Sequence, residues 1–438
     1  MSNYKPYPAY KDSEGEWLGK VPEHWKVIPL KYNLKLVGDK ASSREFAIAL
    51  ENIESWTGKF IQTNSDFEGD GIAFKIGDIL FGKLRPYLAK VYLADSKGEA
   101  VGDFFVIRPT KKIYPRFAQY QILSEEFIKN IDGSTYGAKM PRVNWEFFGD
   151  MPFSTPDFDE QRIIATFLDC ETARIDALTS KKSRFIELLR EKRQVLITQA
   201  ITRGLDPTVK MKDSGVEWLG EVPEHWEVKP LKHIARIVRG ASPRPAGDPK
   251  YFASENIDRE NTPWLTVAEI TKDNNMYLEI TSEYLTKQGT LQSQRFYLGT
   301  LVFTNSGATL GVPKILSIDC CANDGILAFL ALSEKVNIKF LYYFLLTTTV
   351  RLRREMQKGG QPNLNTEIVK SIHFPKAPIA EQSVIVDFLD RQTTRIDSLI
   401  SKTQHSINFL KERRAALITA AVTGQIDVRY NSPMNTPP

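Results

Sequence analysis

The sequence has few of the residues that build disulfide frameworks, metal centres or membrane spans. Its 438 residues include five histidines and three cysteines, namely Cys170, Cys320 and Cys321. Two adjacent thiols and one remote thiol match neither a disulfide framework nor a CxxC metal motif, so we expect small buried thiols in a reducing compartment. No run approaches the roughly 18 apolar residues of a membrane span, and the first residues lack the apolar core of a signal peptide. These absences predict a cytoplasmic protein that holds no metal.

Catalytic signatures are missing as well. The chain has no GxxxxGK(S/T) phosphate loop, no GxSxG elbow, no HExxH zinc motif and no Asn-Pro-Pro-Tyr or Asp-Pro-Pro-Tyr motif of amino-methyltransferases. The glycine-rich residues 307–311 are not followed by Lys-Ser, which favours a loop tip. His24 and His225 have no partner constellation nearby in the sequence, which favours a structural role. We therefore expect no catalytic residue and favour a binding protein over an enzyme.

The overall charge is mildly basic. A net charge of +5 and a pI near 8.8 are compatible with nucleic-acid binding, but many soluble enzymes are as basic. The hydrophobic share of 42% lets each part of the chain bury a core, and the length allows roughly two to four domains. The case for nucleic acid therefore depends on where Lys and Arg are placed.

The chain contains an internal repeat with two parts. Residues 11–37 and 212–238 share W-L-G, V-P-E-H-W and P-L-K, separated by 201 positions. Residues 156–206 and 377–427 share E-Q and R-I-D, separated by 221 positions. The second variable part therefore carries about 20 extra residues, which we place between positions 239 and 294. We call the segments 11–37 and 212–238 the boxes of the repeat. The segments between each box and the following helix otherwise diverge in sequence, so one scaffold carries two different surfaces.

Both helical repeats carry apolar residues on an a/d heptad track. The track residues are Ile164, Leu168, Ile175, Leu178, Phe185, Leu189 and Leu196 in the first copy, and Ile385, Leu389, Ile396, Leu399, Leu410 and Leu417 in the second. A narrow apolar stripe with a charged back needs a partner, and the other copy is the obvious one. We predict an antiparallel coiled coil of the two helices; the alternative is that each helix packs on its own globular unit.

Candidate DNA contacts lie in equivalent loops of the two variable parts. The candidates are Lys83, Arg85, Tyr87, Lys90 and Arg142 in the first part, and Thr304, Asn305, Ser306, Lys314 and Asn363 in the second. Lys and Arg neutralise phosphates, Arg reads guanine, Asn reads adenine, and Ser and Thr bind phosphates or either base. The loops are interpreted as readers of different DNA sequences; the alternative is that they are solvated hairpins.

The order box, variable part and long helix, occurring twice, resembles the specificity (S) subunit of type I restriction-modification systems. The matching motifs are W-L-G-x-V-P-E-H-W at 17–25 and 218–226, G-D-I-L-F-G-K-L-R-P at 77–86, Q-P-N-L-N at 361–365, and P-x-x-E-Q with F-L-D and R-I-D at 378–397. The first part departs at 140–144, where M-P-R-V-N replaces the usual Q-P-N-x-N.

The resemblance implies an α+β fold. It would contain two α/β target recognition domains separated by two long antiparallel helices that form a coiled coil, with an internal pseudo-twofold repeat. The boundaries we expect are a flexible arm at 1–9, recognition domain 1 at 10–158, the first helix at 159–206, recognition domain 2 at 207–379, the second helix at 380–428 and a tail at 429–438.

The resemblance also implies a function. Each recognition domain would read one half of a bipartite double-stranded DNA site through the major groove, and the helices would set the unread spacer. They would also dock two methyltransferase (M) subunits for adenine N6 methylation, with restriction (R) motor-nuclease subunits completing the complex. S-adenosylmethionine, ATP and Mg²⁺ would then bind to the partners, and no cofactor to this chain. Alternatives are a stand-alone DNA-binding regulator of the same fold and a coiled-coil scaffold that binds only proteins.

Overall fold

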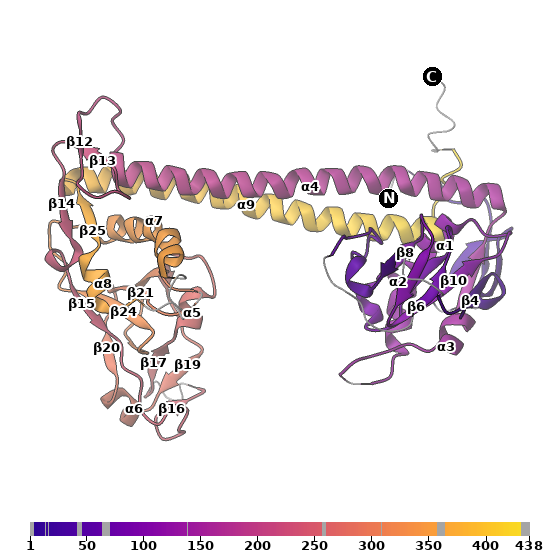
Figure 1. Ribbon diagram of the computed structural model, residues 1–438, viewed down its shortest axis with the longest axis horizontal. Coiled ribbons are helices and arrows are strands. Elements are labelled where there is room, and N and C mark those ends of the chain that lie inside the picture. The colour runs from indigo at the N-terminus through magenta and orange to yellow at the C-terminus, as the bar shows by residue number, and fades with distance from the viewer. Residues whose placement is uncertain are drawn as a thin grey trace. The chain divides into compact units, whose positions relative to one another are not determined.

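The computed structural model describes residues 4–13, 15, 17–41, 46–63, 71–137, 139–255, 260–307, 309–356 and 364–430. The chain divides into two compact units, each described by itself. Unit 1 comprises residues 1–184 and 403–438, and unit 2 comprises residues 185–402. Both divisions fall inside the long helices α4 (Phe158–Arg203) and α9 (Ile379–Val422), so each unit contains part of both helices (Figure 1).

Unit 1 is built around a four-stranded antiparallel sheet. The strand order is β4-β10-β7-β8, formed by Leu34–Val37, Phe104–Pro109, Ile79–Gly82 and Val91–Leu93. A second sheet has the order β5-β9-β6, formed by Ala47–Ile48, Gly98–Val101 and Gly71–Phe74. The remaining elements are α1 (Pro115–Ile122), α2 (Glu125–Gly133), α3 (Trp145–Asp150) and the ladders β1-β2 (Tyr10–Asp12, Lys20–Pro22) and β3-β11 (Lys26–Pro29, Pro152–Thr155).

The main sheet of unit 1 is buried on both faces. Ile79 and Phe81 of β7 share a core with the helices, whereas Leu80 between them packs with Ile48 and Phe74 of the second sheet. All four residues of β7 are buried. A strand that is covered on both faces has a continuous run of apolar residues in its sequence and not an alternation of apolar and polar residues.

Unit 2 repeats this sheet and extends it. The order is β15-β24-β21-β22-β18, formed by Arg236–Arg239, Ile326–Leu330, Leu301–Thr304, Pro313–Leu316 and Tyr277–Leu278. A second sheet has the order β16-β19-β17-β23-β20, formed by Phe252–Ala253, Glu283–Leu285, Thr262–Leu265, Cys320–Ala322 and Gln294–Phe296. The remaining elements are α5 (Val267–Thr271), α6 (Lys287–Leu291), α7 (Ile338–Met356), α8 (Thr366–Ser371) and the ladders β12-β13 (Met211–Asp213, Glu221–Pro223) and β14-β25 (Glu227–Pro230, His373–Lys376).

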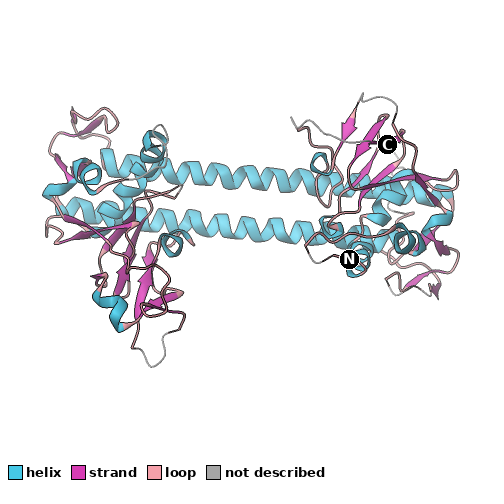
Figure 2. Cartoon of the chain, turned by 60° about the horizontal axis from the view of Figure 1, so that its bottom comes forward, coloured by secondary structure: helices cyan, strands magenta, loops and turns pink. Residues whose placement is uncertain are grey.

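In each unit a part of α4 lies antiparallel to a part of α9 (Figure 1, Figure 2). In unit 1, Arg414 Nε donates to Asp176 Oδ1 at 3.1 Å, and in unit 2, Arg193 Nε lies 3.1 Å from Asp397 Oδ1. Asp397 follows Asp176 by 221 positions, as Arg414 follows Arg193. The same ion pair therefore occurs once in each unit, with the helices exchanged, which is the signature of a twofold repeat.

Buried isoleucines recur every eleven residues along both helices. They are Ile164, Ile175, Ile186 and Ile197 on α4, and Ile385, Ile396, Ile407 and Ile418 on α9, each at most 5% exposed. Eleven residues span three turns at 3.67 residues per turn, which is close to the 3.6 of a straight α-helix. This series, called here the isoleucine seam, explains how the helices pair without the steady drift of a heptad pattern.

The eleven-residue period corrects the heptad prediction at three positions. Leu178, Phe185 and Leu399 are 43%, 45% and 39% exposed, because a track of period 3.5 leaves the seam by about 20° per heptad. The other track residues are buried or partly buried, namely Ile164, Leu168, Ile175, Leu189, Leu196, Ile385, Leu389, Ile396, Leu410 and Leu417. Both packing alternatives apply: the helices pair with each other, and they also pack on their own globular unit, because Ile164 and Leu168 belong to the core of unit 1.

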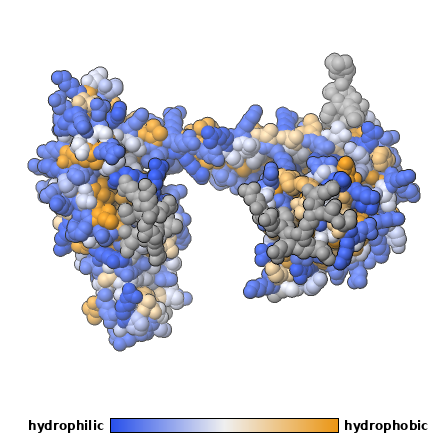
Figure 3. Space-filling view, viewed as in Figure 1, coloured by the Kyte–Doolittle hydropathy of each residue, from blue (hydrophilic) through white to orange (hydrophobic). Residues whose placement is uncertain are grey.

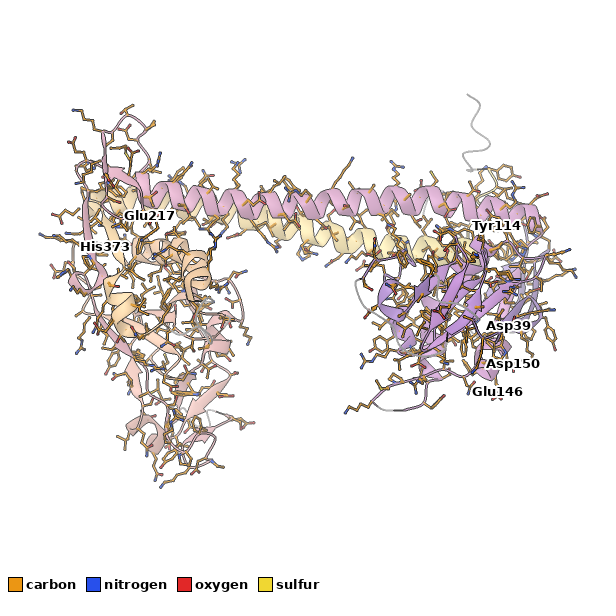
Figure 4. All side chains as sticks on the ribbon, viewed as in Figure 1. Asp39, Tyr114, Glu146, Asp150, Glu217 and His373 are labelled. Carbon is orange, nitrogen blue, oxygen red and sulfur yellow. The ribbon has the colours of Figure 1, made fainter. Side chains whose placement is uncertain are left out.

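In each repeat a histidine of the segment shared by 11–37 and 212–238 binds the start of a long helix. His24 Nε2 lies 2.9 Å from Glu160 Oε2 in unit 1, and His225 Nε2 lies 2.8 Å from Glu381 Oε2 in unit 2. The next residue, Gln161, bonds three backbone groups, including Tyr114 N, which donates to its Oε1 at 2.8 Å (Figure 4). Both histidines thus have a structural partner, as their lack of a catalytic constellation suggested.

The N-terminal arm corrects a second prediction. We expected residues 1–9 to be flexible, but Tyr7 is 3% exposed and its hydroxyl donates to Glu160 Oε1 at 2.7 Å. Asp427 N, which follows α9, donates to Lys5 O at 2.8 Å. The tyrosines and alternating prolines supply packing surface, so residues 4–9 pack against the segment after α9 in unit 1.

Replacing Asp176 should destabilise the protein more than replacing its counterpart Asp397. Asp176 and Arg414 are 20% and 12% exposed, and Asp176 also pairs with Lys59 Nζ at 2.7 Å, whereas Asp397 is 53% exposed. We expect Asp176→Asn to cost about 1.5–3 kcal/mol and Asp397→Asn less than about 1 kcal/mol in the free energy of unfolding. Urea unfolding of the two variants would measure this, and equal losses would contradict it.

Candidate nucleic-acid interface

In unit 1 the fold brings four of the predicted DNA contacts into one loop cluster. Strand β7 ends at Gly82, and the following backbone bonds the segment around Arg142: Arg85 N donates to Pro141 O at 2.8 Å, and Val143 N donates to Lys83 O at 3.1 Å. Arg85 is exposed and adopts a left-handed conformation (φ +50°), and Tyr87 is 44% exposed. Lys83, Arg85, Tyr87 and Arg142 therefore form a basic and aromatic edge at one end of the main sheet.

A carboxylate organises the cations of this edge. Arg142 Nη2 donates to Asp103 Oδ2 at 2.7 Å, and Lys83 Nζ lies 3.8 Å from Asp103 Oδ1. The hydrogen bond to Asp103 raises the pKa of Arg142 above its usual value, so this side chain stays charged. Lys83 also lies over the ring of Phe105 at 5.9 Å, which helps to fix its position.

Lys90 points away from this edge. Its Nζ donates to Leu50 O at 2.6 Å, and burial lowers its pKa below the usual value for lysine. A lysine that is turned inward to a backbone carbonyl ties the residue before β8 to the turn at Leu50–Asn52 and is poorly placed for phosphate. The prediction of a DNA contact at Lys90 is therefore corrected to a structural role.

In unit 2 three of the predicted contacts are buried. Thr304 is 0% exposed: its hydroxyl donates to Thr309 O at 2.7 Å and accepts from Val312 N at 2.9 Å, which closes the loop internally. Lys314 is 2% exposed and forms an ion pair with Asp273, and this bond lowers the pKa of the aspartate. We correct Thr304 and Lys314 to structural roles.

Asn305 lies at the equivalent sheet edge, but its side chain is buried, so we correct it as well to a structural role; Ser306 remains there as a partly exposed candidate. Asn305 is 1% exposed, its Nδ2 donates to Asp324 O at 3.4 Å, and its backbone oxygen accepts from Leu364 N at 2.7 Å. The last bond repeats the one between Lys83 and Val143, which shows that the two loops are equivalent. Ser306 is half-buried beside them. Asn363 lies outside the described residues.

Sequence reasoning passed over the residues that organise both edges. Besides Asn305, Asp324 binds three polar side chains: Ser242 Oγ donates to its Oδ1 at 2.9 Å, Arg244 Nη2 lies 3.5 Å from its Oδ2, and Arg239 Nε donates to its backbone oxygen. The only signal for Asp103 and Asp324 was their separation of 221 positions, the offset of the helical repeat.

The final asparagine of the M-P-R-V-N and Q-P-N-L-N motifs caps a short helix. Asn144 Oδ1 accepts from Phe147 N, and Asn365 Oδ1 accepts from Ile368 N, each at 2.8 Å. Asparagine is a preferred N-cap because its side chain satisfies one of the unpaired N–H groups of the first turn. The asparagine at this position therefore has a role in folding, which does not depend on what the preceding residues of the motif contact.

The described residues offer neither a metal site nor a membrane span. His, Cys, Asp and Glu side chains do not gather there in groups of three or more that could hold a metal ion. Within the same part of the chain, no helix combines the length and apolar character needed to cross a bilayer.

The chain is a duplicated recognition scaffold of α+β class. It has two sheet-rich units, whose equivalent edges carry different side chains, and two long helices that both units share. Residues 223–408 match the family model described as type I restriction modification DNA specificity domain, and the chain as a whole is similar to type I specificity subunits. The resemblance inferred from the motifs is confirmed.

The relatives cover nearly the whole chain. The specificity subunit of type I restriction enzyme MjaVIII from Methanocaldococcus jannaschii is 22% identical over 94% of this chain and 95% of its own length. The EcoKI specificity subunit of Escherichia coli K12 is 19% identical over 94% of this chain and 92% of its own.

Solved structures share the fold. A chain from a study of complex assembly and conformational transition of the type I R-M system matches with a TM-score of 0.75 and 17% identity, covering 92% of this chain and 98% of that one. The HsdS subunit from Thermoanaerobacter tengcongensis matches with a TM-score of 0.52 and 17% identity, covering 93% and 98%. The predicted α+β architecture with an internal repeat is thereby confirmed.

Proposed function

We propose that this chain is the DNA specificity subunit of a type I restriction-modification complex, in which each unit reads one half of a bipartite site. The observation that carries the proposal is the repeated sheet edge. Lys83, Arg85, Tyr87 and Arg142 stand at the edge of unit 1, whereas Ser306 and Arg244 stand at the equivalent edge of unit 2, where the side chain of Asn305 is buried. Equivalent positions with different donors would read different bases, so the two half-sites should differ.

The long helices would set the unread spacer between the half-sites and dock two methyltransferase subunits. Support for docking comes from an apolar stripe that the chain itself does not cover. Leu178, Phe185, Leu188 and Val195 of α4 are 43%, 45%, 47% and 55% exposed. At 3.6 residues per turn they fall within a sector about 100° wide, beside the isoleucine seam. Figure 3 shows hydrophobic residues on the helices among hydrophilic ones.

Catalysis would then belong to the partners. Methyltransferase subunits would bind S-adenosylmethionine and methylate adenine at N6 after base flipping, and restriction subunits would use ATP and Mg²⁺. This chain would supply binding and geometry and would hold no cofactor. The absence of catalytic motifs from the sequence agrees with that division of labour.

Co-expression with a methyltransferase encoded beside this chain, followed by mapping of methylated adenines, tests the proposal. We expect methylation within a split target whose halves differ. Specific DNA binding without any methylation would favour the stand-alone regulator, and protein binding without DNA binding would favour the scaffold. An unsplit methylated motif would overturn the two-unit assignment.

Exchange of residues 40–150 for the corresponding part of another specificity subunit should change one half-site only. The reason is that the main and second sheets of unit 1 have their own cores, which pack without residues of the unit 2 sheets. Methylation mapping of the chimera should show the second half-site and the spacer unaltered. A change in both halves would refute independent reading by the two units.

A further inference from the structure

Each recognition edge places one carboxylate among its cations, at the same end of equivalent strands. Asp103 directly precedes β10, and Asp324 lies two residues before β24. The backbone confirms the equivalence of the site, because Lys83 N donates to Asp103 O at 2.9 Å and Asn305 N donates to Gly325 O at 3.0 Å. The two carboxylates thus reach the same edge from neighbouring positions.

Both carboxylates bind exposed or partly exposed cationic or polar side chains at their edge: those of Asp103 are predicted DNA contacts, and those of Asp324 lie at the equivalent edge of unit 2. Asp103 forms ion pairs with Arg142 at 2.7 Å and with Lys83 at 3.8 Å. Asp324 takes Ser242 at 2.9 Å and Arg244 at 3.5 Å. In each unit, then, one guanidinium at the edge is already paired with a carboxylate in the free protein.

Stability does not explain this arrangement. Arg142 and Arg244 are 45% and 72% exposed, and such exposed ion pairs contribute little to folding. A carboxylate beside DNA also repels phosphates, so each one lowers raw affinity. A feature that costs affinity and recurs at both edges is better explained by specificity, which often uses repulsive elements against wrong partners.

We propose that Asp103 and Asp324 are positioning residues for DNA specificity, which hold the basic side chains of each unit in one geometry and keep them from binding phosphates indiscriminately. On the correct half-site the held Arg and Lys meet their targets, and the repulsion is offset. On other DNA the carboxylate neutralises them, and binding stays weak. This inference rests on the proposed function and adds the residues that set the ratio of specific to non-specific binding.

The test uses the assembled methyltransferase complex and compares its binding to a cognate duplex and to a duplex lacking the site. Asp103→Asn should tighten non-specific binding roughly threefold to tenfold and steepen the dependence of log K on log salt by about one to two, because up to two cations are released. Methylation should then relax at the first half-site only. Asp324→Asn should relax the second half-site only.

Asp150→Asn is the matched control, because Asp150 in the same unit also holds an exposed cation, Lys31, but none of the predicted DNA contacts. Equal effects of the two variants would reduce the result to net charge and overturn the inference. Combining Asp103→Asn with Arg142→Gln should abolish most of the gain in non-specific DNA affinity, since the released cation is then absent. If the unaltered complex fails to bind specific DNA, the proposed function is wrong. If it binds, and the Asp103→Asn complex has the same ratio of specific to non-specific binding, only the inference is wrong.

Discussion

Insertion of eleven residues into each long helix should lengthen the DNA spacer by about five base pairs and leave both half-sites unchanged. The isoleucine seam repeats every eleven residues, so such an insertion preserves which face of each helix is apolar. At 1.5 Å per residue it adds about 16.5 Å, and DNA rises about 3.4 Å per base pair. The insertions belong after Ser183 and after Ser406, which lie opposite in the register of the two Asp–Arg pairs. Methylation mapping would read the new spacer.

A nine-residue insertion at the same places is the control. At about 100° per residue, nine residues turn the seam of one half by 180° relative to the other half. The isoleucines beyond the insertion would then point away from their partner helix, so we expect loss of bipartite methylation and lower stability. An unchanged spacer with the eleven-residue insertion would show that the helices do not set the distance.

The repeat made much of the fold predictable, because an offset in sequence becomes a symmetry in space. The shared E-Q motif predicted an equivalent role for Glu160 and Glu381, and both bind the histidine of their own box. The helices were predictable as helices, but their period was not. Heptads and eleven-residue repeats share Ile164 and Ile175, and only the second half of α4 separates them, where Ile186 is buried and Phe185 is exposed.

The candidate DNA contacts were less predictable, for a physical reason. Strands β21 and β22 are buried on both faces, so no alternation marks which polar side chains point inward. Lys314 is neutralised by Asp273, which lies 41 residues away in the segment that unit 1 lacks. Thr304 is satisfied within its own loop. In unit 1 Lys83, Arg85 and Tyr87 are close in sequence, and the fold brings Arg142 to them, which the sequence did not predict, just as it did not predict the role of Asp103.

The second large effect is expected at the apolar stripe of α4. Leu188→Asp combined with Val195→Asp should reduce association with the methyltransferase at least about a hundredfold. Each side chain is about half exposed in the free chain, so a docking partner would bury it, and losing apolar burial while adding two charges would cost several kcal/mol. Folding should change little, because neither side chain fills the core and Asp costs less than about 1 kcal/mol in helix propensity. Co-purification of the tagged subunits would measure the loss.

Leu291→Asp is the matched control, because Leu291 is 87% exposed at the end of α6 in the same unit and lies far from α4 in sequence and on a different element. It places one aspartate on an exposed leucine, where the α4 variant places two on apolar residues, so it separates docking from a general effect of added negative charge on solubility. If the α4 variant still captures the methyltransferase as the Leu291 variant does, the stripe is not the docking surface. DNA binding by the free chain should survive in both variants, because neither touches the edges at Asp103 or Asp324. Retained DNA binding with lost association would therefore place recognition and docking on separate parts of one chain.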